Sequence, residues 1–181
     1  MILLTFNVLY NIICLIGKGD MFMKVAVIYY SLEGNTKKVA TKIADKLNAD
    51  IYELKEVNSI VPKTGFSKFF WGGKQVVMKE KPDLKELNLD VDQYDYIFIG
   101  TPVWASTFSP AIRSFFSNYN IKGKKIGIFC SHSGGLGKTI QNMKDCLNGN
   151  EFITEMNIID PLKNEIESDK KIDEWLNNIN I

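Results

Sequence analysis

The chain has 181 residues, 45% of them hydrophobic, which suits one buried core and excludes two domains of ordinary size. Its 22 basic and 21 acidic side chains give a formal net charge of +1, which argues against nucleic acid as the partner. The 3 cysteines lack CxxC spacing, a pattern that favours a reducing compartment such as the cytoplasm over a disulfide framework. With 1 histidine, the sequence also lacks the His/Cys cluster of a zinc site.

The N-terminal segment differs from the rest of the chain. Residues 1–16 are largely apolar but short for a bilayer span, and they lack a basic n-region and a clear cleavage site. A folded domain begins naturally at Met23. We therefore interpret residues 1–22 as an apolar extension from a mis-assigned start, with a membrane-associated leader as the alternative, and residues 23–181 as one domain. No membrane partner is expected.

From Met23 onward, the sequence alternates predicted strands with predicted helices. Apolar runs predict strands at residues 24–30, 49–54, 96–100, 125–130 and within 152–159. Helical spacing of apolar residues predicts helices at residues 36–47, 110–119, 137–147 and 168–179, the second of them opened by Ser109 and Pro110. This alternation predicts an α/β fold: a doubly wound, five-stranded parallel sheet in the order 2-1-3-4-5, with helices on both faces.

A long connection separates the second and third predicted strands, at residues 56–93, and part of it should be ordered. Its aromatic cluster around Trp71 is most simply a short helix packed on the sheet, with a ligand cap or a partner contact as alternatives. Its lysines form either a solvated face or a contact for a nucleotide phosphate: Lys63, Lys68, Lys74, Lys79 and Lys81.

A small polar turn at residues 31–36 follows the first strand and opens a helix. In an open α/β sheet, this turn places backbone N–H groups and a helix N-terminus at the carboxyl edge, where ligands bind. Gly34 permits close backbone approach, and Ser31, Asn35 and Thr36 add neutral donors. Because the turn has no lysine or arginine, it favours a tightly held cofactor phosphate over one that is transferred.

Two further loops converge with this turn, because the carboxyl ends of the first, third and fourth strands lie side by side in the predicted order. Residues 101–106 carry Trp104, whose indole is either a hydrophobic lid or a surface that stacks on a flat ring; its position favours stacking. Residues 131–137 are rich in glycine and hydroxyl groups and suit the polar edge of a heteroaromatic ring. His132 is either a ligand contact or, as is more common, a structural histidine.

Together the three loops resemble the flavodoxin family, including its flavin reductases, over residues 23–181. The family's phosphate loop reads hydroxyl-x-hydroxyl-Gly-x-Thr, which Ser31, Gly34 and Thr36 match. Residues 100–105 and 131–137 are similar to the second and third flavin loops. The resemblance implies FMN as the cofactor, bound by Ser31, Leu32, Glu33, Gly34, Asn35, Thr36, Thr101, Pro102, Val103, Trp104, Ala105, Ser131, His132, Ser133, Gly134, Gly135 and Gly137.

The resemblance also implies how the protein would act on FMN. The flavin carries the chemistry and the protein supplies position and electrostatics, so no catalytic acid or nucleophile is expected. Backbone groups around Trp104 and Ala105 would stabilise one redox state at the ring's N5, and stacking on the indole would lower the second reduction potential. Glu33 departs from the family's serine or threonine, and a carboxylate beside a phosphate is repulsive unless its side chain points outward.

Electron transfer through non-covalently bound FMN, to a redox partner protein or a small-molecule acceptor, is our first functional interpretation. An NAD(P)H-dependent flavin or quinone reductase is the alternative, since the near-neutral charge differs from the acidic surface common on carriers. A flavodoxin-like protein-binding module without flavin is a third, supported best by Glu33. Residues 132–139 nearly match a P-loop, but His132 stands where that motif requires glycine, so nucleotide hydrolysis is poorly supported.

Overall fold

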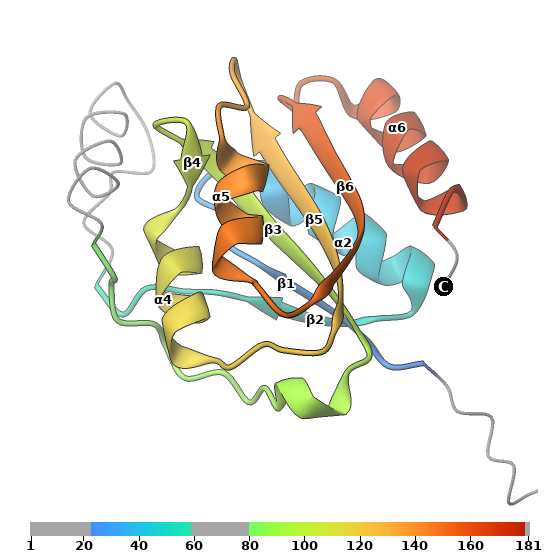
Figure 1. Ribbon diagram of the computed structural model, residues 1–181. Coiled ribbons are helices and arrows are strands. Elements are labelled where there is room, and N and C mark those ends of the chain that lie inside the picture. The colour runs from blue at the N-terminus through green and yellow to red at the C-terminus, as the bar shows by residue number, and fades with distance from the viewer. Residues whose placement is uncertain (1–22, 59–79, 180–181) are drawn as a thin grey trace, which may run out of the picture.

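A parallel sheet forms the centre of the computed structural model, which describes residues 23–58 and 80–179 (Figure 1). Its strand order is β2-β1-β3-β5-β6, which is the predicted 2-1-3-4-5 order of the parallel strands. These strands are β1 (Val25–Tyr29), β2 (Asp50–Glu53), β3 (Tyr96–Trp104), β5 (Lys125–His132) and β6 (Glu151–Ile159). Outside the described residues lie the predicted extension at 1–22, Trp71, Lys63, Lys68, Lys74 and Lys79.

A short antiparallel strand adds to the predicted five-stranded parallel sheet. β4 (Thr107–Phe108) pairs antiparallel with the end of β3, so the sheet has 6 strands instead of five. β3 therefore continues through residues 101–104, which we predicted as loop, and β5 likewise continues to His132. A strand of 2 residues is too short to show an alternating apolar pattern in the sequence. β4 forms because the tight turn brings it alongside the end of β3, with which it pairs.

Helices cover both faces of the sheet, as predicted (Figure 1). One face carries α2 (Asn35–Leu47) and α6 (Glu165–Asn177), which contact each other. The other carries α4 (Pro110–Asn118) and α5 (Thr139–Cys146), and the 3-10 helix η1 (Val91–Gln93) precedes β3. α6 begins three residues earlier than predicted, with Asn164 as its N-cap residue and Ser168 buried within the helix.

Two hydrophobic cores lie on either side of the sheet. On the α2 and α6 side, four of the five apolar residues of α2 that the spacing indicated are buried and Leu47 is partly buried; the four are Val39, Ala40, Ile43 and Ala44. On the α4 and α5 side, Ile112 and Phe115 of α4 and Met143 of α5 are fully buried. Within the described ranges, no helix is both long and apolar enough to cross a membrane.

Two glycines in the central strands lie directly under aromatic rings of the neighbouring strand. Gly100 of β3 is opposite Phe129 of β5, and Gly127 of β5 is opposite Phe98 of β3. A Cβ built on Gly100 would lie 2.1 Å from the Phe129 ring, and one on Gly127 would lie 2.5 Å from the Phe98 ring. Each ring therefore occupies the space that a side chain on the opposite strand would need.

Candidate functional site

A cavity of about 270 Å³ opens where β1, β3 and β5 end at the carboxyl edge of the sheet. Fourteen predicted site residues line it: Ser31, Leu32, Glu33, Asn35, Thr36, Pro102, Val103, Trp104, Ala105, Ser131, His132, Ser133, Gly134 and Gly135. Ser106 and Asp160 also line it and were missed. Gly34, Thr101 and Gly137 are absent from the lining. The structure therefore brings the three predicted loops together around one space.

The first loop presents the N-terminus of α2 to the cavity. Gly34 is the N-cap with φ 93°, its amide N–H donates to Ser31 Oγ at 3.1 Å, and no side chain caps the helix. The first turn of α2 has no acidic residue, so the positive end of the helix dipole is not neutralised there. Thr36 Oγ1 and Ser131 Oγ lie 2.8 Å apart and both residues are buried, which ties this loop to β5.

Two carboxylates border the cavity. Glu33 lines the cavity and is exposed, and the outward orientation of its side chain stays a prediction. Asp160, at the end of β6, accepts a hydrogen bond from Ser133 and forms an ion pair with Lys163 at 3.2 Å. The Ser133 hydrogen bond, followed by Lys163, holds the pKa of Asp160 below its ordinary value, so this carboxylate is ionised at neutral pH. The position of Asp160 directly after a predicted strand was the signal that could have revealed it.

The second loop is a tight hairpin between β3 and β4. Trp104 is half-buried, and its indole meets the Tyr30 ring edge-on, with centroids 5.8 Å apart and an interplanar angle of 85°. Ala105 and Ser106 form the turn with φ values of 44° and 65°, the left-handed region that costs a non-glycine residue about 1 kcal/mol or more. The site therefore contains backbone strain beside its large aromatic side chain.

The third loop holds this strained turn in place. Lys138 N–H donates to the Ser106 carbonyl at 2.9 Å. Gly137 has φ 58°, and a Cβ there would lie 2.4 Å from Ser106 Cβ. Gly137 does not line the cavity; because it has no side chain, it lets the second and third loops approach each other.

We expect Gly137→Ala to lower the free energy of unfolding by about 2 kcal/mol, because it adds left-handed strain and a clash with Ser106. Urea denaturation would measure the loss. Gly123→Ala is the matched control, since Gly123 has φ 69° and a Cβ there would meet nothing within 4 Å, so this variant tests the strain alone. Equal losses in the two variants would contradict the contact with Ser106.

Two predicted residues have internal contacts of their own. Thr101 is fully buried, and its Oγ1 accepts a hydrogen bond from Ser109 N–H at 3.0 Å, which secures the start of α4. His132 Nε2 lies 3.3 Å from Asn157 Oδ1, while its buried Nδ1 has no hydrogen-bond partner among the described residues. A buried ring nitrogen without a partner beside a cavity is consistent with a polar ligand contact.

The groups around the cavity fit a phosphorylated ligand with a flat ring. Hydroxyl groups and an uncapped helix N-terminus suit an anion, a half-buried indole suits an aromatic face, and His132 offers a polar contact. The described residues contain no group of three His, Cys, Asp or Glu side chains arranged to hold a metal ion.

Residues 24–179 match the flavodoxin family. The chain belongs to the flavodoxin family. An uncharacterized protein of Methanocaldococcus jannaschii is 29% identical over 148 residues, which cover 72% of this chain and 95% of that protein. The flavodoxin-family resemblance and the fold that it implies are thus confirmed.

Solved structures share this flavodoxin fold. A flavoprotein from Lactobacillus acidophilus, solved in complex with FMN, has a TM-score of 0.66 at 23% identity, covering 85% of this chain and 99% of that one. A WrbA-like flavodoxin from Agrobacterium tumefaciens has a TM-score of 0.54 at 15% identity, covering 86% and 96%. At these identities the likeness concerns the fold, and the individual site residues stay predictions.

Proposed function

We propose that this flavodoxin-family protein binds FMN non-covalently in the cavity and transfers electrons through it. The convergence of the three loops on one cavity carries the proposal, because each loop suits a different part of FMN. The L. acidophilus structure with FMN supports this choice of ligand for the fold. When bound, FMN supplies one- and two-electron chemistry that no side chain of the protein can provide.

The first loop would hold the phosphate. Ser31, Asn35 and Thr36 provide neutral donors, and the N-terminus of α2 provides the favourable dipole. Thr36 is fixed by Ser131, so the loop does not need to be ordered by the ligand. Pre-organisation of this kind reduces the entropy lost on binding.

The second and third loops would hold the ring. Trp104 lines the cavity with an indole that meets the Tyr30 ring edge-on, and His132 and the Gly134-Gly135 backbone would face the polar edge. His132 Nε2 lies 3.3 Å from Asn157 Oδ1, so Nδ1, which has no partner among the described residues, would be the ring atom left for a polar contact with the ligand. The ring would thus be held by stacking on one side and polar contacts on the other.

We expect Trp104→Ala to weaken FMN binding about tenfold, since an aromatic contact of this kind is worth ~1.4 kcal/mol. The second reduction potential should rise, because the indole no longer disfavours the anionic reduced ring. Spectrophotometric titration with FMN and with a redox dye would measure both. Trp104→Phe should retain most of the affinity, and unchanged affinity and potentials in Trp104→Ala would exclude stacking.

The first experiment is an anaerobic absorption spectrum of the purified protein with added FMN, followed by NADH or NADPH. Flavin bands that a chemical or protein donor alone can bleach would support a carrier. Bleaching by a nicotinamide alone would support the NAD(P)H-dependent flavin or quinone reductase, which the net charge of +1 favours as the second candidate. A protein that binds no flavin would instead fit the protein-binding module.

A further inference from the structure

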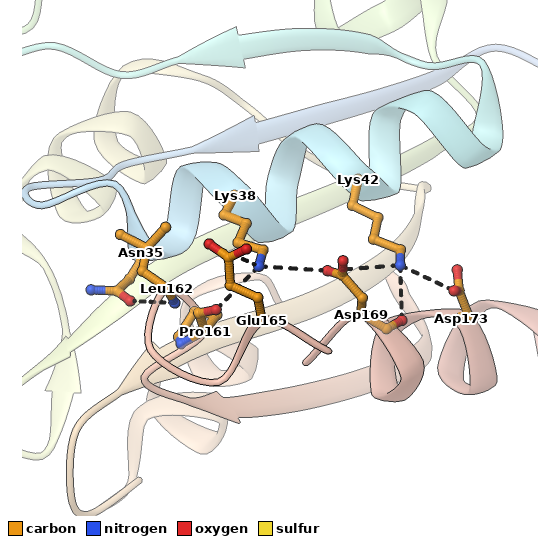
Figure 2. Close-up of polar contacts among 8 residues, drawn as sticks. All are labelled: Asn35, Lys38, Lys42, Pro161, Leu162, Glu165, Asp169 and Asp173. Carbon is orange, nitrogen blue, oxygen red and sulfur yellow. Dashed lines mark hydrogen bonds and ion pairs between the residues drawn. The ribbon is translucent and has the colours of Figure 1, made fainter. Parts of the chain in front are cut away.

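A fourth loop, residues 160–164 between β6 and α6, braces two of the three cavity loops. On the third-loop side, Asp160 N–H donates to the His132 carbonyl at 2.9 Å, and Ser133 donates to the Asp160 carboxylate. On the first-loop side, Leu162 N–H donates to Asn35 Oδ1 at 3.2 Å (Figure 2). The position of this fourth loop therefore affects both walls of the cavity.

Lys38 docks the fourth loop onto α2. Its Nζ donates to the Pro161 carbonyl at 3.3 Å and lies 3.7 Å from Glu165 Oε1 and 3.8 Å from Asp169 Oδ1 (Figure 2). The Lys38 side chain is 18% exposed, whereas the side chains of Glu165 and Asp169 are 64% and 45% exposed. Its backbone N–H donates to the Gly34 carbonyl, which places Lys38 one helical turn after the N-cap of α2.

Lys42 makes comparable contacts one turn further along α2. Its Nζ donates to the Asp169 carbonyl at 2.9 Å and to Asp173 Oδ2 at 3.0 Å, and its side chain is 21% exposed. Lys46 continues the row by pairing with Asp173 at 3.3 Å. Lys42 and Lys46 thus join α2 to α6, whereas Lys38 joins α2 to both α6 and the fourth loop.

Loss of the Lys38 charge would have two effects at the proposed phosphate site. The Pro161 carbonyl would lose its donor, which loosens the loop that contacts Asn35. The Glu165 carboxylate, in the first turn of α6, would lose its compensating charge near the N-terminus of α2. Both effects disfavour a bound phosphate. An uncharged ligand should be affected less, because Asn35 belongs to the loop that would hold the phosphate and because repulsion from a carboxylate requires an anion.

We propose that Lys38 is a positioning residue that sets the preference of the site for a phosphorylated flavin over an unphosphorylated one. This inference rests on the proposed binding of FMN. Lys38 acts by holding the fourth loop in place and by compensating the negative charge of the α6 carboxylates beside it.

The test compares the dissociation constants of FMN and riboflavin for the wild type, Lys38→Met and Lys42→Met. Lys38→Met should weaken FMN binding about tenfold and riboflavin binding less than about twofold, since only FMN carries the anion. Lys42→Met is the matched control and should leave the ratio of the two constants unchanged. Lys38→Arg, which keeps the charge, should restore most of the preference for FMN.

A second readout needs no flavin. The melting temperature of the apoprotein should rise with added inorganic phosphate in the wild type and in Lys42→Met, and rise less in Lys38→Met. If the ratio of the FMN and riboflavin dissociation constants is unchanged in Lys38→Met, or changes equally in Lys42→Met, the proposed role of Lys38 is wrong while the proposed binding of FMN still stands. A wild type that binds neither FMN nor riboflavin would overturn the proposed function itself, and the role of Lys38 with it.

Discussion

Gly100→Ala should destabilise the protein by about 3 kcal/mol or more, the upper range for overpacking a rigid core. The new methyl group would lie 2.1 Å from the ring of Phe129, which is fully buried on the adjacent strand. Neither the central strand nor the ring has room to move, because both are enclosed by the sheet and by the α2–α6 core. The midpoint of urea denaturation of the apoprotein measures the effect.

Gly134→Ala is the control for this prediction, since a Cβ at Gly134 meets nothing within 4 Å and its midpoint should stay close to that of the wild type. The clash can also be tested directly in a Phe129→Leu background. There Gly100→Ala should cost at least about 1 kcal/mol less, because the smaller side chain vacates the space, and a double-mutant cycle measures this coupling. Additive losses would show that Gly100 and Phe129 do not compete for the same volume.

Gly34→Val should weaken FMN binding about 100-fold, equivalent to ~2.7 kcal/mol. Gly34 has φ 93° at the N-cap of α2, a conformation that a β-branched residue adopts only with strain. The loop would therefore change shape where its N–H groups should meet the phosphate. Titration of the apoprotein with FMN, followed by quenching of flavin fluorescence, measures the affinity.

Gly34→Asn provides the comparison, because asparagine tolerates the left-handed region and is a favourable N-cap residue. It should keep most of the affinity for FMN. If Gly34→Val also bound FMN as the wild type does, the phosphate would have to lie elsewhere in the cavity and the assignment of the first loop would be wrong.

The local patterns in the sequence were sufficient for most of the fold. The apolar spacing of Val39, Ala40 and Ile43 predicted α2, because apolar residues on the buried face of a helix recur every three to four positions. The strands before each predicted loop could be recognised as continuous apolar runs, because a strand covered by helices on both faces of the sheet buries nearly all its side chains. Strand ends were less clear, since β3 continues through polar and proline residues to Trp104 and is extended there by pairing with β4.

The site was predictable as three loops but not as a complete cavity. Trp104 and Thr36 could be placed at the carboxyl edge from the strands that precede them. Asp160 and Ser106 join the same cavity through the bend after β6 and the turn after β3, and neither carries a motif. Gly137 proved to contact the Ser106 turn instead of the cavity, a relation between residues on two different loops.

The sequence by itself determined the alternation of strands and helices, the family and the three polar loops, because each depends on short-range periodicity or on a local motif. Only the tertiary structure decided which side chains face one another across those loops. The hairpin at Ala105, the packing of Phe129 on Gly100 and the docking of Lys38 on the fourth loop all join segments that are separate in the sequence or shaped by a partner strand. Such contacts depend on the shape and charge of the segment on the other side of the contact, and a local sequence pattern contains no information about that segment.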